Sequence, residues 1–235
     1  MQQIANADPR PRWERRKEAR PAELLAAALD LFVERGYAGT RLDDVAARAG
    51  VSKGTLYLYF AAKEDLFKAV VRENIVSLIS AKADAVAGHG GPSDALLADL
   101  ISSWWHEFGS TRAGGISKLL MAESGNFPEI ARFFLDEVIV PWHALLGSAV
   151  ERGIARGEFR PVEVPTFVQV LTAPMVMLSL WKNSFSACSQ RPIDPEAYIR
   201  TVIATTLAAL RPNHERPDAP AGVTKRTERG PKRTG

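Results

Sequence analysis

The segment KGTLYLY, residues 53–59, holds the side chains of this chain that are best suited to bind another molecule. A lysine ammonium and two tyrosine hydroxyls can bond phosphate oxygens, and a glycine allows a backbone to come close. A tyrosine ring or a leucine side chain can also touch the methyl group of a thymine. This chemistry is typical of nucleic-acid binding.

Residues for catalysis are not grouped in a comparable way. The sequence contains no His-Glu-x-x-His pattern, no cluster of Cys and His, no glycine-rich phosphate loop and no serine elbow. The four histidines are scattered at positions 89, 106, 143 and 214. We therefore expect no cofactor and no metal ion, and an enzyme that uses an apolar pocket is a disfavoured alternative.

The composition of TLYLYF, residues 55–60, is that of a β-strand, but its context favours a helix. Ser52 is a good N-cap, and an isolated strand without a neighbour is not stable. In a helix, Leu56 and Phe60 share an inward face, with Tyr59 at its edge. The outward face then holds Lys53, Gly54, Thr55, Tyr57 and Leu58.

A second short helix precedes this one. Thr40 and Asp43 form a predicted capping box at its start, and Gly50 ends it. The helix before it spans residues 21–36, shows one apolar face and stops at Gly36. Two short helices joined by Gly50-Val51-Ser52 fit a helix-turn-helix.

Helical periodicity continues through most of the chain, so the fold class is all-α with about nine helices. A second capping box is predicted at Asn126–Glu129, and Asp194 is predicted to cap the last helix with Pro195 at its first position. Pro141 and Pro174 should kink their helices. The further helices are expected at about residues 63–86, 93–110, 115–124, 127–156, 165–186 and 195–210.

Charge is unevenly distributed within the net charge of +3. Residues 1–20 carry six basic and three acidic groups, and residues 211–235 carry seven and three, so the middle is acidic. We predict a basic arm (1–20), a helix-turn-helix domain (21–62), a ligand-binding and dimerisation domain (63–210) and a disordered tail (211–235). The tails either aid solubility or attract a polyanion such as DNA.

The sequence favours a cytoplasmic protein. No signal peptide opens the chain, and the apolar run 164–181 is interrupted by Gln169, Thr172, Pro174 and Ser179, which indicates a buried helix and no membrane partner. The single cysteine, Cys188, cannot form an intrachain disulfide, and a buried thiol is the commoner case.

Residues 22–70 resemble the DNA-binding domain of the TetR/AcrR family of bacterial transcriptional regulators. The resemblance lies in ALDLFVERGY, in T-x-x-D-V-A-x-x-A-G-V-S-K-G-T-L-Y-x-Y-F and in K-E-x-L. It implies an all-helical homodimer, in which three N-terminal helices bind double-stranded DNA and the remaining six or so bind a ligand and dimerise.

The resemblance also implies roles for single residues. Thr40, Arg41 and Lys63 would contact backbone phosphates. Ser52, Lys53, Gly54, Thr55, Tyr57, Leu58 and Tyr59 would line the major groove. Two positions depart from the family pattern: Leu58 can read a base only by apolar contact, and Ala62 lacks the capping side chain that is common there.

The C-terminal half contains aromatic and methionine side chains that suit either a ligand pocket or an ordinary core. The candidates for ligand binding are Trp104, Trp105, Phe108, Met121, Phe134, Trp142, Met177 and Trp181. Trp104 and Trp105 are adjacent, so they cannot face the same core. His106, Glu107, Glu123 and His143 are either polar handles or part of a solvated face.

The last two predicted helices would pair with those of the partner subunit, by the same resemblance. The residues expected at the dimer interface are Val170, Met177, Ile199, Val202, Ile203, Thr206 and Leu210. The alternative is an ordinary intrachain helix.

The preferred hypothesis is a ligand-responsive repressor that binds a palindromic operator as a dimer and is released by a small apolar or amphipathic effector. The fourth helix, which joins both domains, would carry the signal. A DNA-binding protein without a small-molecule ligand is the alternative.

Overall fold

The computed structural model describes residues 12–212, with side chains from residue 21 onward. Within that range the chain is helical and contains no strand, as predicted. The helices are α1 (Arg12–Gly39), α2 (Leu42–Arg48), α3 (Lys53–Tyr59), α4 (Lys63–Val71), α5 (Ser77–Ala87), α6 (Ser93–Trp104), α7 (Gly115–Glu123), α8 (Pro128–Phe134), α9 (Val140–Ala155), α10 (Val164–Ser184) and α11 (Pro195–Leu210). Three π-turns and one 3₁₀ turn lie between them: η1 (Arg72–Val76), η2 (Trp105–Gly109), η3 (Arg112–Gly114) and η4 (Leu135–Ile139).

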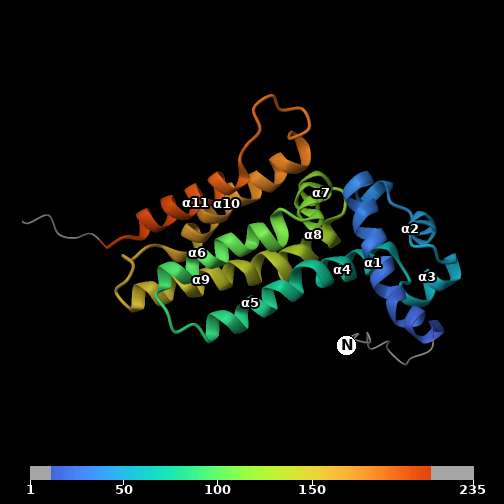
Figure 1. Ribbon diagram of the computed structural model, residues 1–235, viewed down its shortest axis with the longest axis horizontal. Coiled ribbons are helices and arrows are strands. Elements are labelled where there is room, and N and C mark those ends of the chain that lie inside the picture. Colours follow the sequence, from blue (N-terminus) through green and yellow to red (C-terminus); the bar gives the residue numbers. More distant parts are fainter. Residues whose placement is uncertain (1–11, 213–235) are drawn as a thin grey trace, which may run out of the picture.

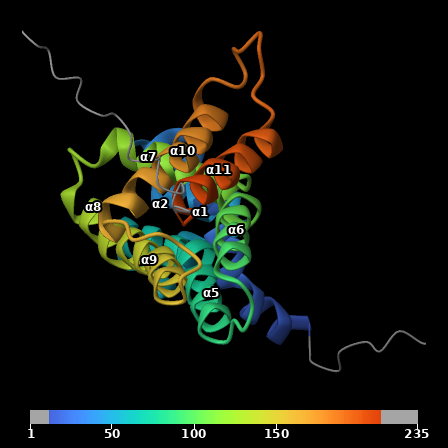
Figure 2. The same ribbon diagram turned by 90° about the vertical axis from the view of Figure 1, so that its left-hand side faces the viewer.

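The molecule is elongated, with α1, α2 and α3 at one end (Figure 1). The helices α5, α6, α9, α10 and α11 run along the rest of its length, and α4 leads from one part to the other. Figure 2, which looks along the long axis, shows α10 and α11 on one side of the bundle. The segment that joins these two helices stands away from the body in both views and carries Cys188, which is exposed rather than buried.

The boundaries of the predicted tails differ from the structure. Helix α1 begins at Arg12, well inside the segment that the sequence assigns to a basic arm. The rest of that arm, residues 1–11, and the tail after residue 212 lie outside the described residues.

Two predicted helix starts are confirmed. Ser52 Oγ accepts a hydrogen bond of 3.1 Å from the amide of Thr55, at the third position of α3. Asp194 Oδ1 accepts bonds of 3.0 and 3.2 Å from the amides of Glu196 and Ala197, next to Pro195.

Both predicted capping boxes are wrong. The Thr40 side chain is buried, and its hydroxyl donates to the carbonyl of Gly36 at 2.7 Å instead of capping α2, which starts without a side-chain cap. Helix α8 starts after Phe127, again without one. Burial decides the first case, because a buried hydroxyl must bond the nearest available group.

Two glycines shape the helix-turn-helix. Gly36 has φ +77° and breaks the helical path near the end of α1, as expected of a terminator. Gly50 has φ +67° in the turn between α2 and α3. Side chains disfavour both conformations, so glycine is required there by the backbone.

The hydrophobic residues form two cores, which do not follow the predicted domain boundary at residue 62. The first core joins Leu56 and Phe67 to Ile116 and Phe133, so α1–α4 share their interior with α7 and α8. The second core is built by α6, α9, α10 and α11. The helix-turn-helix is therefore packed onto the C-terminal half rather than tethered to it.

Each π-turn lies where a long helix passes from one core to the other. In the helix that contains η4, Ile130 and Phe133 belong to the first core and Leu146 to the second. In the helix that contains η2, Ile101 belongs to the second core and Phe108 to the first. A π-turn adds one residue and so turns the apolar face toward the new neighbours.

Two helical stretches, Pro128–Ala155 and Val164–Ser184, are long and apolar enough to cross a membrane by composition alone. Core helices have the same composition, and both stretches contribute residues to the second core. The most apolar window of Val164–Ser184 is 33% buried, so α10 keeps an exposed apolar side.

Leu56 provides the first test, because its side chain is 0% exposed within the first core. Leu56→Ala should lower the free energy of unfolding by about 2–5 kcal/mol through the cavity that it leaves. Denaturant titration followed by circular dichroism measures the loss. The control is Leu58→Ala in the same helix, which should change stability by less than about 0.5 kcal/mol because that side chain is exposed.

Candidate nucleic-acid interface and internal cavity

Helix α3 divides into two faces as the sequence predicts. Leu56 is 0% exposed, whereas Leu58 is 84% and Tyr57 51% exposed. Tyr59 lies between them at 39%. Large apolar side chains that are exposed together on a short helix commonly mark a contact surface.

The polar groups of α3 are ordered without a partner molecule. The Ser52 and Thr55 hydroxyls are 2.8 Å apart, and Lys53 forms an ion pair with Asp43 of α2. The hydrogen bond to Asp43 raises the pKa of Lys53. A Cβ at Gly54 would meet nothing closer than the Ser52 oxygen at 3.9 Å, so the fold itself does not require a glycine there.

Of the three residues expected at phosphates, only Arg41 is exposed. Thr40 is buried, as described above. Lys63 Nζ turns inward and donates to the carbonyls of Tyr37 and Ala38 at 2.8 and 3.3 Å, and it lies 4.5 Å from the centre of the Tyr37 ring. Desolvation lowers the pKa of Lys63. In this conformation Lys63 holds the α1–α2 connection and does not extend toward a phosphate.

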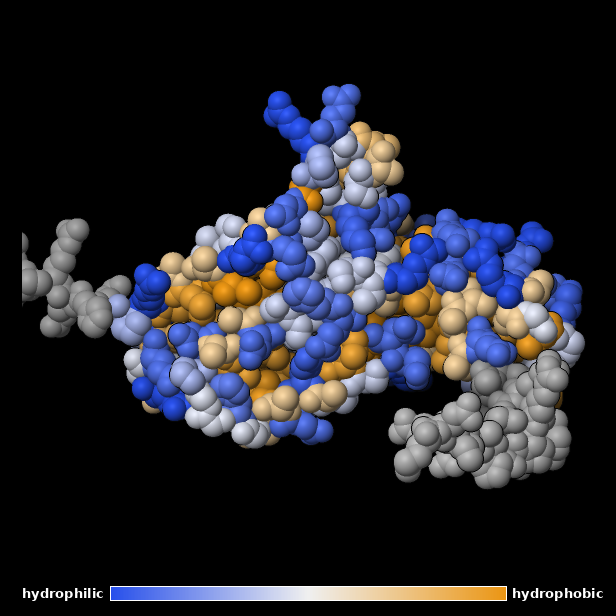
Figure 3. All heavy atoms as spheres, viewed as in Figure 1, coloured by the Kyte–Doolittle hydropathy of each residue, from blue (hydrophilic) through white to orange (hydrophobic). Residues whose placement is uncertain are grey.

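The start of α4 is better held than Ala62 suggests. Asp65 Oδ2 accepts a hydrogen bond of 3.1 Å from the amide of Ala62, which satisfies one of the unpaired amides at the helix start. The missing cap at Ala62 therefore does not leave Lys63 loosely held, because both the helix start and the lysine have partners. Figure 3 shows strongly hydrophilic residues gathered around α2, at this end of the molecule.

The second candidate site is a cavity of about 580 Å³ in the C-terminal half. Its walls come from α5, α6, α7, α8, α9 and α10 and from all three π-turns. The lining is largely apolar and includes Ile75, Leu78, Leu120, Val138 and Leu180. A volume of this order suits a small organic molecule.

Most of the predicted ligand-binding residues line this cavity. These are Trp104, Phe108, Met121, Phe134, Trp142 and Met177. Met121 and Met177 are 68% and 54% exposed, so they lie at its mouth.

Two predicted ligand-binding residues do not line the cavity. Trp105 is 2% exposed in the second core, with Lys182 over its ring. Trp181 packs against Phe185 outside the cavity. The adjacent residues Trp104 and Trp105 thus face different surroundings, as their spacing requires.

Two interacting pairs of polar side chains lie in the cavity wall, beside single polar residues such as Ser117 and Gln169. Lys82 and Glu107 form an ion pair of 2.5 Å, and His143 Nε2 lies 3.2 Å from Thr172 Oγ1. Burial lowers the pKa of His143, which favours the neutral imidazole. Glu107 and His143 were open candidates in the sequence, whereas Lys82 fits an ordinary helix surface and Thr172 stood out only as a break in an apolar run.

The other two open candidates have different places. His106 Nε2 lies 3.2 Å from Glu196 of α11, and Glu123 contacts the α1–α2 connection. Within residues 21–212, no three His, Cys, Asp or Glu side chains are grouped to hold a metal ion.

The predicted dimer residues fall into two groups. Ile199, Val202, Thr206 and Leu210 are 8% exposed or less and belong to their own chain's interior, so assigning them to a dimer surface is wrong. Val170 and Met177 are 67% and 54% exposed on α10, and Ile203 is half-buried. The apolar face of α11 serves the intrachain core, which was the alternative.

The exposed face of α3 and the packing of α1–α3 define a helix-turn-helix DNA-binding protein. Comparison with known families agrees: residues 24–70 match "Bacterial regulatory proteins, tetR family", and residues 90–205 match "Tetracyclin repressor-like, C-terminal domain". The chain belongs to the TetR family of transcriptional regulators, and so to a family of regulators rather than of enzymes.

Individual relatives match only part of the chain or have low sequence identity to it. The transcriptional activator FasR of Mycolicibacterium smegmatis is 42% identical over 64 residues, which is 27% of this chain and 29% of FasR. The transcriptional repressor KstR2 of Rhodococcus jostii is 29% identical over 145 residues, 61% of this chain and 70% of KstR2. The structure of FadR from Bacillus subtilis with stearoyl-CoA has a TM-score of 0.63 at 19% identity, and it covers 81% of this chain and 99% of that one.

Leu58 allows a test of how this helix reads DNA. If its side chain touches a thymine methyl, replacing that thymine by deoxyuridine should weaken DNA binding by the wild-type protein about fourfold. This factor corresponds to the free energy of burying one methyl group. Leu58→Ala should bind both duplexes equally. Fluorescence anisotropy measures this, with duplexes of the site that footprinting identifies in which each thymine is replaced in turn. Equal sensitivity of the variant and the wild type at every thymine would contradict the assignment.

Proposed function

We propose that the protein is a ligand-responsive transcriptional repressor, which binds a palindromic operator as a homodimer and is released by a small apolar or amphipathic effector. The observation that carries the proposal is that one chain contains both an exposed recognition helix, α3, and a largely apolar cavity. Two helices of the cavity wall, α7 and α8, also pack on α1 and α4. The proposal places the protein in the cytoplasm, where it meets DNA.

The face of α3 supports the DNA-binding part. Tyr57, Leu58 and Lys53 are exposed together, and α3 projects from the end of the molecule beside α2 (Figure 1). A recognition helix in the major groove reads bases with such side chains, and two copies read a palindrome.

The cavity supports the effector part. Its apolar lining favours a hydrophobic body, and the His143–Thr172 and Lys82–Glu107 pairs offer hydrogen-bonding partners for a polar group. The FadR structure, which has the same fold, contains stearoyl-CoA. A ligand-independent regulator, the alternative, would have no use for a cavity of this size.

The exposed side of α10 supports the dimer. Val170, Ala173 and Met177 lie at positions i, i+3 and i+7, so they form one exposed apolar stripe, of which Ala173 and Met177 also border the cavity. Ala204 and Ala208 are exposed on the neighbouring α11 and are small enough for close helix packing. A second copy that packs its own stripe here gives a two-fold dimer.

The direct test combines footprinting and ligand screening. The dimer should protect a palindromic site in the DNA upstream of its own gene, and Lys53→Ala and Tyr57→Ala should each weaken that binding about tenfold or more at moderate salt. Long-chain acyl compounds such as stearoyl-CoA, screened by thermal shift, should raise the melting temperature and lower operator affinity. The matched control is Arg191→Ala, an exposed residue between α10 and α11 that neither belongs to α3 nor lines the cavity.

Several results would contradict the proposal. If Lys53→Ala and Tyr57→Ala both bind the operator with wild-type affinity, α3 does not lie in the groove. Ligands that stabilise the protein but leave operator affinity unchanged would favour the ligand-independent alternative. Binding and release are thermodynamically linked, so the operator must also weaken effector binding by the same factor.

The dimer part has a test of its own. Val170→Glu should convert the dimer to a monomer, because a buried, unpaired carboxylate costs several kcal/mol at such a surface. Sedimentation velocity across a range of protein concentrations measures the mass. Val140→Glu is the matched control, since Val140 is also an exposed valine, at 55%, but lies on α9. A dimer that survives Val170→Glu would place the interface elsewhere.

A further inference from the structure

Helix α7 and the turn before it touch both the cavity and the DNA-binding end. Ser117, Leu120 and Met121 line the cavity. On the other side, Gly115 lies so close to α1 that a Cβ there would be 2.6 Å from Val33 Cγ1. This one helix thus separates the cavity from α1 and packs tightly on it.

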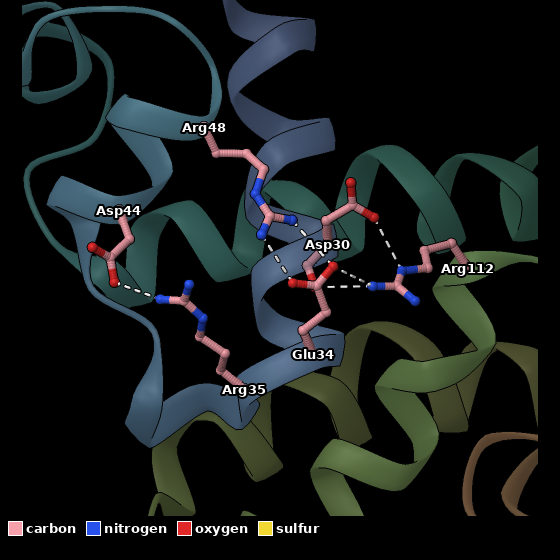
Figure 4. A network of polar contacts seen from close by, with 6 residues as sticks. All are labelled: Asp30, Glu34, Arg35, Asp44, Arg48 and Arg112. Carbon is pink, nitrogen blue, oxygen red and sulfur yellow. Dashed lines mark hydrogen bonds and ion pairs between the residues drawn. The ribbon is translucent and has the colours of Figure 1, made fainter.

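The first polar contact of this element with the DNA-binding end is made by Arg112 in η3. Its Nε donates to Asp30 Oδ1 at 3.0 Å, and its Nη2 donates to Glu34 Oε1 at 3.0 Å (Figure 4). Both acceptors lie on α1, so the guanidinium spans two positions one turn apart.

Glu34 extends this contact to α2. The same carboxylate accepts two hydrogen bonds from Arg48, of 3.1 Å at Oε1 and 2.9 Å at Oε2 (Figure 4). The hydrogen bond from Arg48 is the main reason that the pKa of Glu34 is lowered. One shared carboxylate therefore links Arg112 of the C-terminal half to α2 of the helix-turn-helix.

The second polar contact is made by Glu123 at the other end of α7. Its two carboxylate oxygens accept from the amide of Ala38 at 3.2 and 3.3 Å. Ala38 lies at the end of α1, two residues after Gly36 and just before the connection into α2. A Cβ at Gly36 would be 2.5 Å from Glu123 Oε1, so the carboxylate reaches this amide across the open side of a glycine.

These contacts add little to stability. The ion-paired side chains of Asp30, Glu34, Arg48 and Arg112 are 36–46% exposed, and such pairs contribute about 0–1 kcal/mol each. Their effect is geometric. The two contacts, in η3 before α7 and at the end of α7, add to the apolar packing and restrict how α1 and α2 can rotate against this element.

We propose that Arg112 and Glu123 are positioning residues for DNA binding. They hold the helix-turn-helix in the orientation in which both recognition helices of a dimer meet one operator, and they make that orientation follow α7. The inference rests on the proposed function and adds to it the residues that align the reading helix, neither of which touches the groove.

A palindromic site is bound only when two reading helices are aligned at once, whereas non-specific attraction to phosphates needs no fixed orientation. Loosening either contact therefore adds an ordering cost to operator binding alone. The loss should appear in the ratio of specific to non-specific affinity and not in thermal stability.

The experiment uses the full chain with the upstream duplex that footprinting identifies and a scrambled duplex of equal length. Glu123→Ala and Arg112→Ala should each weaken operator binding about fivefold and change scrambled binding by less than about twofold. Glu123→Gln, which keeps a carbonyl acceptor, should recover most of the affinity. Arg112→Lys keeps the charge but not the planar fork, so it should behave like Arg112→Ala. Arg191→Ala and Glu151→Gln are exposed controls.

Hydrogen exchange gives an independent readout of the contact. In Glu123→Ala, exchange of the peptide that contains Ala38 should be about tenfold faster, with an unchanged melting temperature. Operator affinity equal to that of the controls, equal losses on both duplexes, or losses that follow melting temperature would each overturn the inference. If the wild type prefers no sequence at all, the proposed function fails and the inference falls with it. A wild-type preference with unchanged variants overturns the inference alone.

Discussion

The burial of Tyr37 is the constraint on which the DNA-binding end depends. Its ring stacks on Phe32 at 5.8 Å and meets Phe67 and Phe127 edge-on at 5.5 and 4.8 Å between ring centres. These partners come from α1, from α4 and from the segment before α8, so one side chain joins three parts of the fold. Burial raises the pKa of Tyr37 to about 12, so its hydroxyl stays neutral even where a free tyrosine would ionise. Lys63 closes the cluster over the ring, and the connection into α2 is placed as a result.

The free protein already pairs two of its cations, Lys53 and Lys63, at the surface where DNA is proposed to bind. Lys53 is paired with Asp43, and Lys63 is bonded to backbone carbonyls. Phosphates must compete with these internal partners, which reduces indiscriminate attraction to DNA. The largest exposed side chains of α3, Tyr57 and Leu58, are aromatic and aliphatic, so the proposed reading face offers apolar contacts beside the paired lysine.

Much of the fold could be predicted from the sequence because helical periodicity records which side of a helix is apolar. This pattern was enough to identify α3 as a helix and to place Leu56 on its buried face. Periodicity does not record which neighbour covers an apolar face, so Ile199 and Leu210 were assigned to a partner when their own chain buries them. It also cannot separate core from cavity, as Trp105 and Trp104 show. Capping at Thr40 failed because burial, which the local pattern does not contain, redirected the hydroxyl.

The π-turns could not be predicted, because the local pattern does not record which neighbours a helix packs against. They also limit how the chain tolerates insertions and deletions. Each adds one residue to its helix, which rotates everything downstream by about 100° relative to the upstream part. A single-residue deletion near η1, η2 or η4 would restore an unbroken α-helix and turn one of its two apolar faces to solvent. Insertions and deletions within these three helices are thus constrained by how far they rotate the apolar face about the helix axis, more than by the number of residues that they add or remove.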